Sequence, residues 1–214
     1  RGIYSASLQG YKHALTTAAA ANCSYFELAF DGFEDYSGNY DGHGHMNFVR
    51  TVGEGGITPA SGNAHTGKYS LPVTSGDPLK FQTTTLTTPA TNQKFFTPKP
   101  NQDYYFSLWV KANVSATTMP SVTIVDNSGT TTFNVDLKVA AIEGWRKIEG
   151  KIKAGAASST VSIQLNAGSH TAYFDDVRMQ PFKSAMTSTV YDPNTHWVLA
   201  ELDNRNFATF YLYD

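Results

Sequence analysis

Two adjacent carboxylates, Asp175 and Asp176, interrupt a run of strand-forming residues at Thr171–Met179. The aromatic and β-branched residues around them favour a strand, whereas aspartate is depleted from strands. Burying these carboxylates costs free energy unless a partner compensates their lost hydration. A cation is one such partner, and because no run of Cys or His lies nearby, oxygen ligands favour a hard ion such as calcium. In the alternative, both aspartates end the strand and are solvated.

Aromatic side chains suited to sugar binding are a second feature. A neutral sugar is bound by flat apolar faces and a few polar groups, and aromatic residues make up 13% of the chain. Along residues 104–111, period two places Tyr105 and Trp109 on one face, and the more apolar opposite face is expected to be core. Packing between sheets is the alternative for Trp109. The predicted ligand-binding residues are Tyr36, Tyr40 and His43 on a Gly-rich loop, with Tyr105 and Trp109 on this strand.

Histidines and acidic loop residues offer other chemistry. His43 and His45 follow Asp41 closely, but without a third fixed ligand they are interpreted as solvated imidazoles rather than as a metal site. The loop carboxylates that could form the acid and base pair of a glycosidase are Asp35, Asp41, Glu54 and Asp77. Their separation does not follow from the sequence. The chain contains no nucleophile elbow, phosphate-binding Gly loop with Lys or His-Glu-x-x-His motif, so we predict a protein that is not an enzyme.

Composition narrows the class of protein. The 214 residues carry a formal charge of -2, and only 16% are charged, which disfavours nucleic acid and anionic membranes as partners. Cys23 is the single cysteine, so an internal disulfide and a cysteine-based zinc site are excluded. No apolar run reaches transmembrane length, and we expect no membrane insertion. Because the sequence starts at Arg1 and stops within a strand-like run, we expect a segment of a larger multidomain chain.

Short strand-like runs separated by Gly, Pro, Asn and Asp clusters dominate the chain. They predict an all-β fold, an antiparallel β-sandwich or jelly roll with a short C-terminal β-hairpin extension. Tyr25–Phe30 is expected to be the first strand. The predicted domains are an N-terminal linker at 1–24, which contains a short helix or linker at 13–21, the sandwich at 25–181 and a hairpin at 182–214.

Five landmarks in order resemble jelly-roll carbohydrate-binding modules of the galactose-binding-like superfamily, particularly those attached to xylanases and glucanases. Together they span roughly 150 residues. The landmarks are Asp31-Gly-Phe-Glu34, Ala64–Leu71, Tyr105–Lys111, Gly144-Trp145 and Tyr173–Val177. The resemblance implies a sandwich that binds a polysaccharide or oligosaccharide without catalysis.

The same resemblance implies a structural calcium ion. Carried over residue by residue, its ligands are Glu34, the backbone carbonyl of Lys68, and Asp175, with Asp31 and Asp176 as further members. Ligands from distant segments would pin the N-terminal strand of the sandwich to the C-terminal one. The ion would therefore stabilise the fold rather than take part in a reaction.

The C-terminal residues are similar to the Tyr-Asp repeats of large Rhs-type surface and secreted proteins. Tyr191-Asp192 recurs as Tyr213-Asp214, 22 positions later, with two strand-like runs and a turn at 203–206 between them. This likeness implies a bacterial secreted or cell-surface protein. We expect either carbohydrate binding or, alternatively, a structural or adhesive spacer domain without a glycan site.

Overall fold

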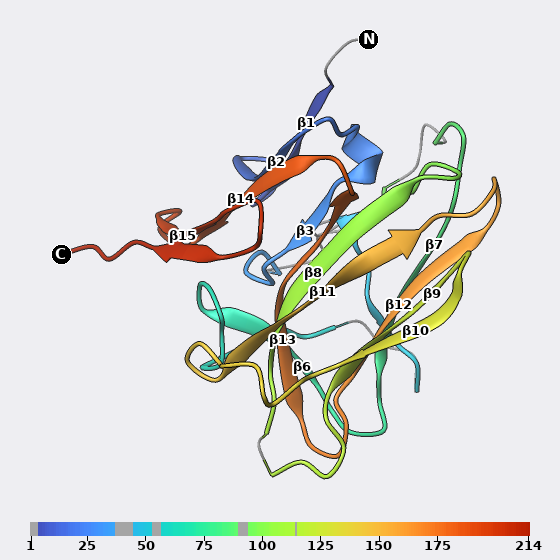
Figure 1. The fold of residues 1–214 in the computed structure, drawn as a ribbon. Coiled ribbons are helices and arrows are strands. Elements are labelled where there is room, and N and C mark those ends of the chain that lie inside the picture. The colour runs from blue at the N-terminus through green and yellow to red at the C-terminus, as the bar shows by residue number, and fades with distance from the viewer. Residues whose placement is uncertain (1–3, 37–44, 53–56, 90–93, 114) are drawn as a thin grey trace.

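The computed structural model describes residues 4–36, 45–52, 57–89, 94–113 and 115–214 (Figure 1). Every paired strand is antiparallel, and the strands form three sheets. We call them the open sheet, the middle sheet and the covering sheet. The predicted antiparallel β-sandwich is confirmed by the first two.

The open and middle sheets form the sandwich. The open sheet has the order β10-β9-β12-β7-β4, and the middle sheet has the order β11-β8-β13-β6-β5, with β3 also paired to β13. The open-sheet strands are β4 (Val49–Arg50), β7 (Leu79–Thr84), β9 (Ser121–Asp126), β10 (Gly129–Asn134) and β12 (Thr160–Asn166). The middle-sheet strands are β3 (Ala29–Asp31), β5 (Ala60–Ser61), β6 (Tyr69–Val73), β8 (Asp103–Lys111), β11 (Trp145–Lys153) and β13 (Ala172–Pro181).

The main core lies between these two sheets. It is built from alternating apolar residues, such as Phe106 and Leu108 of β8 and Ile163 and Leu165 of β12. The face of β8 that was expected to be core is therefore confirmed. Because side chains alternate along a strand, the polar residues between them point away from this core. The open sheet consequently presents a polar outward face.

The covering sheet packs on the other side of the middle sheet (Figure 1). Its order is β1-β2-β14-β15-β16, so it joins an N-terminal hairpin to three C-terminal strands. A second apolar cluster lies beneath it and includes Phe30 of β3 and Met186 of β14. The strands are β1 (Ser5–Gly10), β2 (Leu15–Ala21), β14 (Ala185–Tyr191), β15 (Val198–Leu202) and β16 (Ala208–Phe210).

Two predictions about local structure need correction. Residues 13–21, expected to be a helix or linker, mostly form β2. Alternate alanines of this strand, such as Ala18 and Ala20, are buried in the second apolar cluster. Tertiary packing here overrides the helix preference of alanine. Tyr25–Glu27 is a short 3-10 helix, and the expected strand begins only at Ala29. No helix among the described residues is long and apolar enough to cross a membrane.

Candidate functional site

The paired aspartates lie within β13 at a β-bulge. The register of β13 against β8 shifts between Asp175 and Arg178, and Asp176 has a left-handed backbone with φ +48°. Aspartate is among the residues that tolerate this conformation. Both carboxylates are fully buried. The alternative of two solvated residues at a strand end is therefore wrong.

Residues 65 and 66 satisfy these two carboxylates. His65 Nδ1 lies 2.6 Å from one oxygen of Asp176, and the Thr66 hydroxyl donates to the other at 2.7 Å. Asp175 accepts from the backbone N–H groups of His65 at 2.7 Å and of Asp176 at 2.8 Å. Sequence reasoning assigned no role to this pair. Their position next to Gly67 and Lys68 in a motif already singled out was the available signal.

Glu34 brings a third carboxylate to the same region. Its Oε1 accepts from the backbone N–H groups of Lys68 at 2.7 Å and Tyr69 at 2.6 Å. A Cβ on Gly67 would lie only 2.4 Å from this oxygen, and Gly67 has φ +66°, so glycine is needed here. The other oxygen, Oε2, is buried without a hydrogen-bond partner. One carboxylate oxygen is therefore left unsatisfied inside the fold.

Burial disfavours charge throughout this cluster. The pKa of Asp31 is raised to about 7 and that of Glu34 to about 8; loss of hydration is the largest cause, and the negative charge of Asp176 contributes to both. Burial, followed by the charge of Asp176, raises the pKa of Asp175 well above its usual range. At neutral pH such a cluster holds protons or is compensated by a cation.

The side chains of this cluster could hold a hard cation only if backbone carbonyl groups also served as ligands. Among the described residues, no three His, Cys, Asp or Glu side chains are grouped as a metal site. Hard cations such as calcium also accept backbone carbonyl ligands. The unpartnered Oε2 of Glu34 is the observation that suits such an ion. The Lys68 side chain is directed elsewhere, with its Nζ 2.5 Å from Asp192.

Trp109 offers no free ring to a sugar. It is 2% exposed, its indole stacks on His65 with centroids 4.1 Å apart, and its Nε1 donates to the carbonyl of Asn206 at 2.7 Å. Asn206 belongs to the turn between β15 and β16 of the covering sheet. The predicted platform role is therefore wrong, and the packing alternative holds. Trp145 is also buried.

The other predicted ligand-binding residues do not lie together in one site. Tyr105 is half-buried and donates its hydroxyl to Glu149, and burial raises its pKa to about 12. Tyr36 packs against Phe33 and donates to Asp31, so it belongs to the carboxylate region. Tyr40 and His43 lie outside the described residues. His45, expected to be solvated, is buried, with its Nδ1 2.9 Å from the carbonyl of Leu28.

The outward face of the open sheet is a polar surface. Cross-strand pairs align its side chains in rows, such as Thr132, Thr123, Gln164 and Lys80. Its outward positions among the described strand residues carry no aromatic side chain. They are Val49, Lys80, Gln82, Thr84, Ser121, Thr123, Val125, Thr130, Thr132, Asn134, Thr160, Ser162, Gln164 and Asn166. Period two in these strands is the sequence signal that would have found this face.

Hydrogen bonds order the centre of this face. Gln164 Nε2 donates to Asn166 Oδ1 at 3.0 Å, and Asn166 Nδ2 donates to Thr123 Oγ1 at 3.3 Å. The hydroxyls of Thr123 and Thr132 lie 3.3 Å apart. These side chains are therefore held in place before any ligand arrives.

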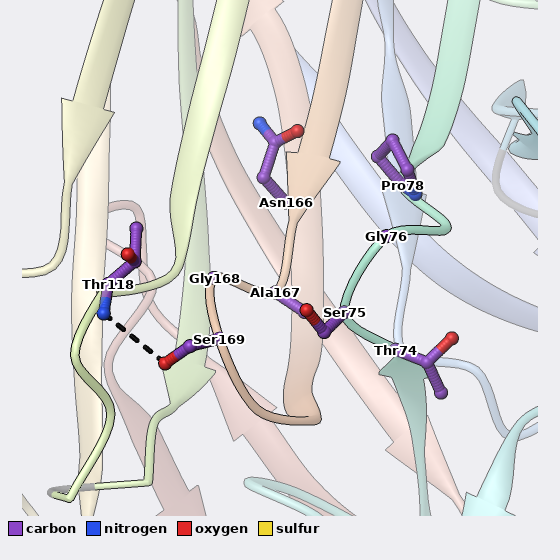
Figure 2. A pocket seen from close by; sticks show the side chains of 9 residues that line it. All are labelled: Thr74, Ser75, Gly76, Pro78, Thr118, Asn166, Ala167, Gly168 and Ser169. Atoms are coloured by element: carbon purple, nitrogen blue, oxygen red, sulfur yellow. Dashed lines mark hydrogen bonds between the residues drawn. The ribbon is translucent and has the colours of Figure 1, made fainter.

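A pocket of about 490 Å³ opens where β12 ends (Figure 2). Loops that connect the open and middle sheets form its walls. Figure 2 shows Thr74 to Pro78 on one side, Thr118 and Ser169 on the other, and Asn166 above them on β12. The lining residues are Thr74, Ser75, Gly76, Pro78, Thr118, Asn166, Ala167, Gly168 and Ser169. None of them is charged or aromatic.

Comparison with protein families decides the class of this fold. The profile of a carbohydrate binding domain, CBM_4_9, matches residues 31–177, which is more than half of the chain. The chain belongs to this carbohydrate binding domain family. The match covers the open sheet and most of the middle sheet of this carbohydrate binding domain, and the covering sheet lies outside the match. The family is one of binding modules, and absence of catalysis in this chain stays a prediction.

Several solved structures are similar to this carbohydrate binding domain. The CBM22-1 xylan-binding domain from Paenibacillus barcinonensis Xyn10C has 18% identity and a TM-score of 0.46 over 72% of this chain and 93% of that chain. CBM22-1-GH10 modules of Clostridium thermocellum Xyn10B, complexed with xylohexaose, have 19% identity and a TM-score of 0.45 over 72% of this chain and 28% of that chain. TmCBM61 in complex with β-1,4-galactotriose has 13% identity and a TM-score of 0.40, covering 63% and 88% of the two chains. No curated protein matches the sequence.

Proposed function

We propose that this domain binds an uncharged polysaccharide or oligosaccharide on the outward face of the open sheet. The observation that carries the proposal is the ordered network of Thr123, Gln164 and Asn166 on a sheet face that no other described strand covers. Hydroxyl and amide groups can both donate to and accept from sugar hydroxyls. The family match supports a carbohydrate as the ligand.

The composition of this face favours a particular mode of binding. Lys80 is the one charged side chain among its described outward positions, so an acidic glycan gains little electrostatic attraction. Without rings for stacking, affinity must come from several hydrogen bonds, each of which contributes about 0.5–1.5 kcal/mol. We therefore expect weak binding that improves as more sugar units contact the sheet.

Retention on insoluble xylan, β-1,4-galactan and cellulose tests the proposal. The whole chain is expected to be retained by at least one of them, and Thr123→Val and Gln164→Ala should reduce that retention. Thr187→Val is the matched control, because Thr187 is exposed on β14 of the covering sheet. Full retention of both face variants, or an equal loss in the control and the face variants, would contradict the proposal.

A structural or adhesive spacer is the second candidate function. The observation favouring it is the group of exposed apolar side chains at the C-terminal side of the covering sheet, including Trp197, Phe210 and Tyr213. These residues lie outside the family match. A folded chain that no glycan retains, in the panel above or on a wider glycan array, would favour the spacer function.

A calcium ion is proposed to stabilise the sandwich. Glu34, the carbonyl of Lys68 and Asp175 are its proposed ligands, and Asp31 and Asp176 are further candidates. The unpartnered oxygen of Glu34 and the elevated carboxylate pKa values support this proposal. Bound calcium would neutralise buried negative charge and tie β3, β6 and β13 together. Calorimetric titration of calcium into the chelator-treated chain tests for the site.

The setting of the chain is proposed to be a larger secreted or cell-surface protein of bacterial type, in which the Tyr-Asp residues begin a repeat region. In support, Tyr191 and Tyr213 make related contacts, since each hydroxyl donates to a backbone carbonyl of a neighbouring strand, at 3.1 and 2.9 Å. Fractionation of the native cells, followed by immunoblotting against this domain, tests both parts. A band confined to the cytoplasm, or one no larger than this chain, would contradict them.

A further inference from the structure

The pocket at the end of β12 adjoins the polar outward face of the open sheet. Asn166 belongs to both, because it lines the pocket (Figure 2) and also donates to Thr123 on the face. Resting on the function proposed above, we propose that this pocket binds the terminal sugar of a glycan chain that lies along β12. The domain would then recognise chain ends rather than internal segments.

One wall of the pocket is fixed by hydrogen bonds. The Ser169 hydroxyl accepts from the backbone N–H groups of Thr117 at 3.0 Å and Thr118 at 3.2 Å, and the Ser169 N–H donates to the Thr118 carbonyl at 3.0 Å. Gly168 has φ +74°, and a Cβ there would lie 2.1 Å from the same carbonyl. The loop after β12 is thus held closely against the loop before β9.

The opposite wall is also held before binding. Asp77 N–H donates to the Thr74 carbonyl at 3.2 Å, and Thr51 N–H donates to the Pro78 carbonyl at 3.0 Å. Arg50 pairs with Asp77 beside this wall. Ligand binding therefore needs little loop ordering, which lowers its entropic cost.

The lining selects the class of ligand. It combines the hydroxyls of Thr74, Ser75 and Thr118 with an amide, backbone groups and the apolar surfaces of Pro78 and Ala167. No lining side chain is charged, which suits a neutral polyhydroxylated ring rather than a uronic acid or a phosphate. The volume of about 490 Å³ lies within the range of small-ligand pockets, about 300–1,000 Å³.

The position of the pocket favours binding of the end of a glycan chain. β12 stops here, and the connecting loops that line the pocket lie beyond its end. A glycan running along Gln164 and Asn166 meets these loops after Asn166. Internal sugars can lie on the face, whereas a terminal ring can enter the pocket.

Amide chemical-shift mapping of the isotope-labelled whole chain tests this proposal, with xylohexaose, β-1,4-galactotriose and cellohexaose as probes. We expect at least one probe to shift Gly76, Gly168 and Ser169 together with Thr123 and Gln164. At equal mass, its longer polymer should shift the pocket amides less, in proportion to its fewer ends. Shifts on the face alone would overturn chain-end recognition and leave the proposed function standing. No shifts with any probe would overturn both.

A bulky substitution provides the second test. Ser75→Tyr is expected to weaken binding of the responding oligosaccharide at least tenfold, because the ring would fill the mouth of the pocket. Ser5→Tyr, at an exposed position on β1, is the matched control and should leave binding unchanged. If Ser75→Tyr is misfolded, Thr118→Tyr replaces it. A folded variant with full affinity would overturn the proposal.

Discussion

The indole of Trp109 lies flat on the imidazole of His65, with ring centroids 4.1 Å apart and an interplanar angle of 15°. This contact is one link in a chain across the molecule. His65 contacts Asp176 in the buried carboxylate region, and Trp109 donates to Asn206 in the covering sheet. Asn206 also donates from its amide to the Asp176 carbonyl at 2.9 Å. The covering sheet is thus tied directly to the bulge that carries the aspartates.

Trp109→Ala is expected to destabilise the fold by about 3–5 kcal/mol, as large-to-small changes of buried aromatic residues do. Urea denaturation of the whole chain measures the loss. Trp197→Ala is the matched control, since Trp197 is 53% exposed and its removal should change stability little. A stable Trp109→Ala variant that has lost glycan retention would instead restore the platform role.

The benefit of calcium is expected to grow as pH rises. The folded pKa values of Asp31, about 7, and Glu34, about 8, exceed the usual values of about 3.9 and 4.3. Without the ion, the folded state therefore binds more protons. The stability that the protonated Asp31 and Glu34 side chains contribute is fully present below about pH 4 and is lost as pH rises through about 7 and 8. An ion that replaces those protons should raise Tm strongly at pH 8 and little at pH 5, and an equal rise at both would contradict this account.

Glu34→Gln removes one buried negative charge and keeps the shape of the side chain. At pH 8 without calcium, the variant is expected to melt above the parent, because the amide is not charged in the low-dielectric interior. It should also lose most of the calcium response. Glu149→Gln, which changes a partly exposed carboxylate on β11, is the control and should keep that response. Thermal melts with calcium and with chelator decide between these outcomes.

Gly67→Ala and Gly62→Ala separate backbone strain from steric clash. Both glycines have positive φ, which costs an alanine about 1–2 kcal/mol at either position. Only at Gly67 would the added Cβ meet Glu34, whereas at Gly62 nothing lies within 4 Å. Gly67→Ala should therefore be clearly the more destabilising in urea melts. Equal losses would mean that the Glu34 oxygen does not occupy this position.

Much of the sandwich follows from sequence because its strands alternate clearly. Tyr104–Lys111 and the run before Asn166 show period two, and both form strands; the apolar face of the first is core, as expected. The N-terminal hairpin does not follow, since an Ala- and Thr-rich tract such as 13–21 lacks the large residues that mark a strand. Its conformation depends on pairing with β14, whose residues lie more than 160 positions later.

The candidate site was predictable only in part. The carboxylates of Glu34, Asp175 and Asp176 stand out by residue type, and the structure buries all three. The burial of Trp109 was not predictable, because the turn that covers it is distant in sequence. The polar face of the open sheet was also not predicted, because Thr, Gln and Asn indicate a sugar site less clearly in sequence than aromatic residues do.

A co-crystal structure of the whole chain with an oligosaccharide of a retained glycan tests the central claim most directly. The account predicts a sugar chain on the open sheet, with hydroxyls hydrogen-bonded to Thr123, Gln164 and Asn166. A sugar bound instead beside Tyr105 on the middle sheet, or on the exposed aromatic residues of the covering sheet, would contradict it.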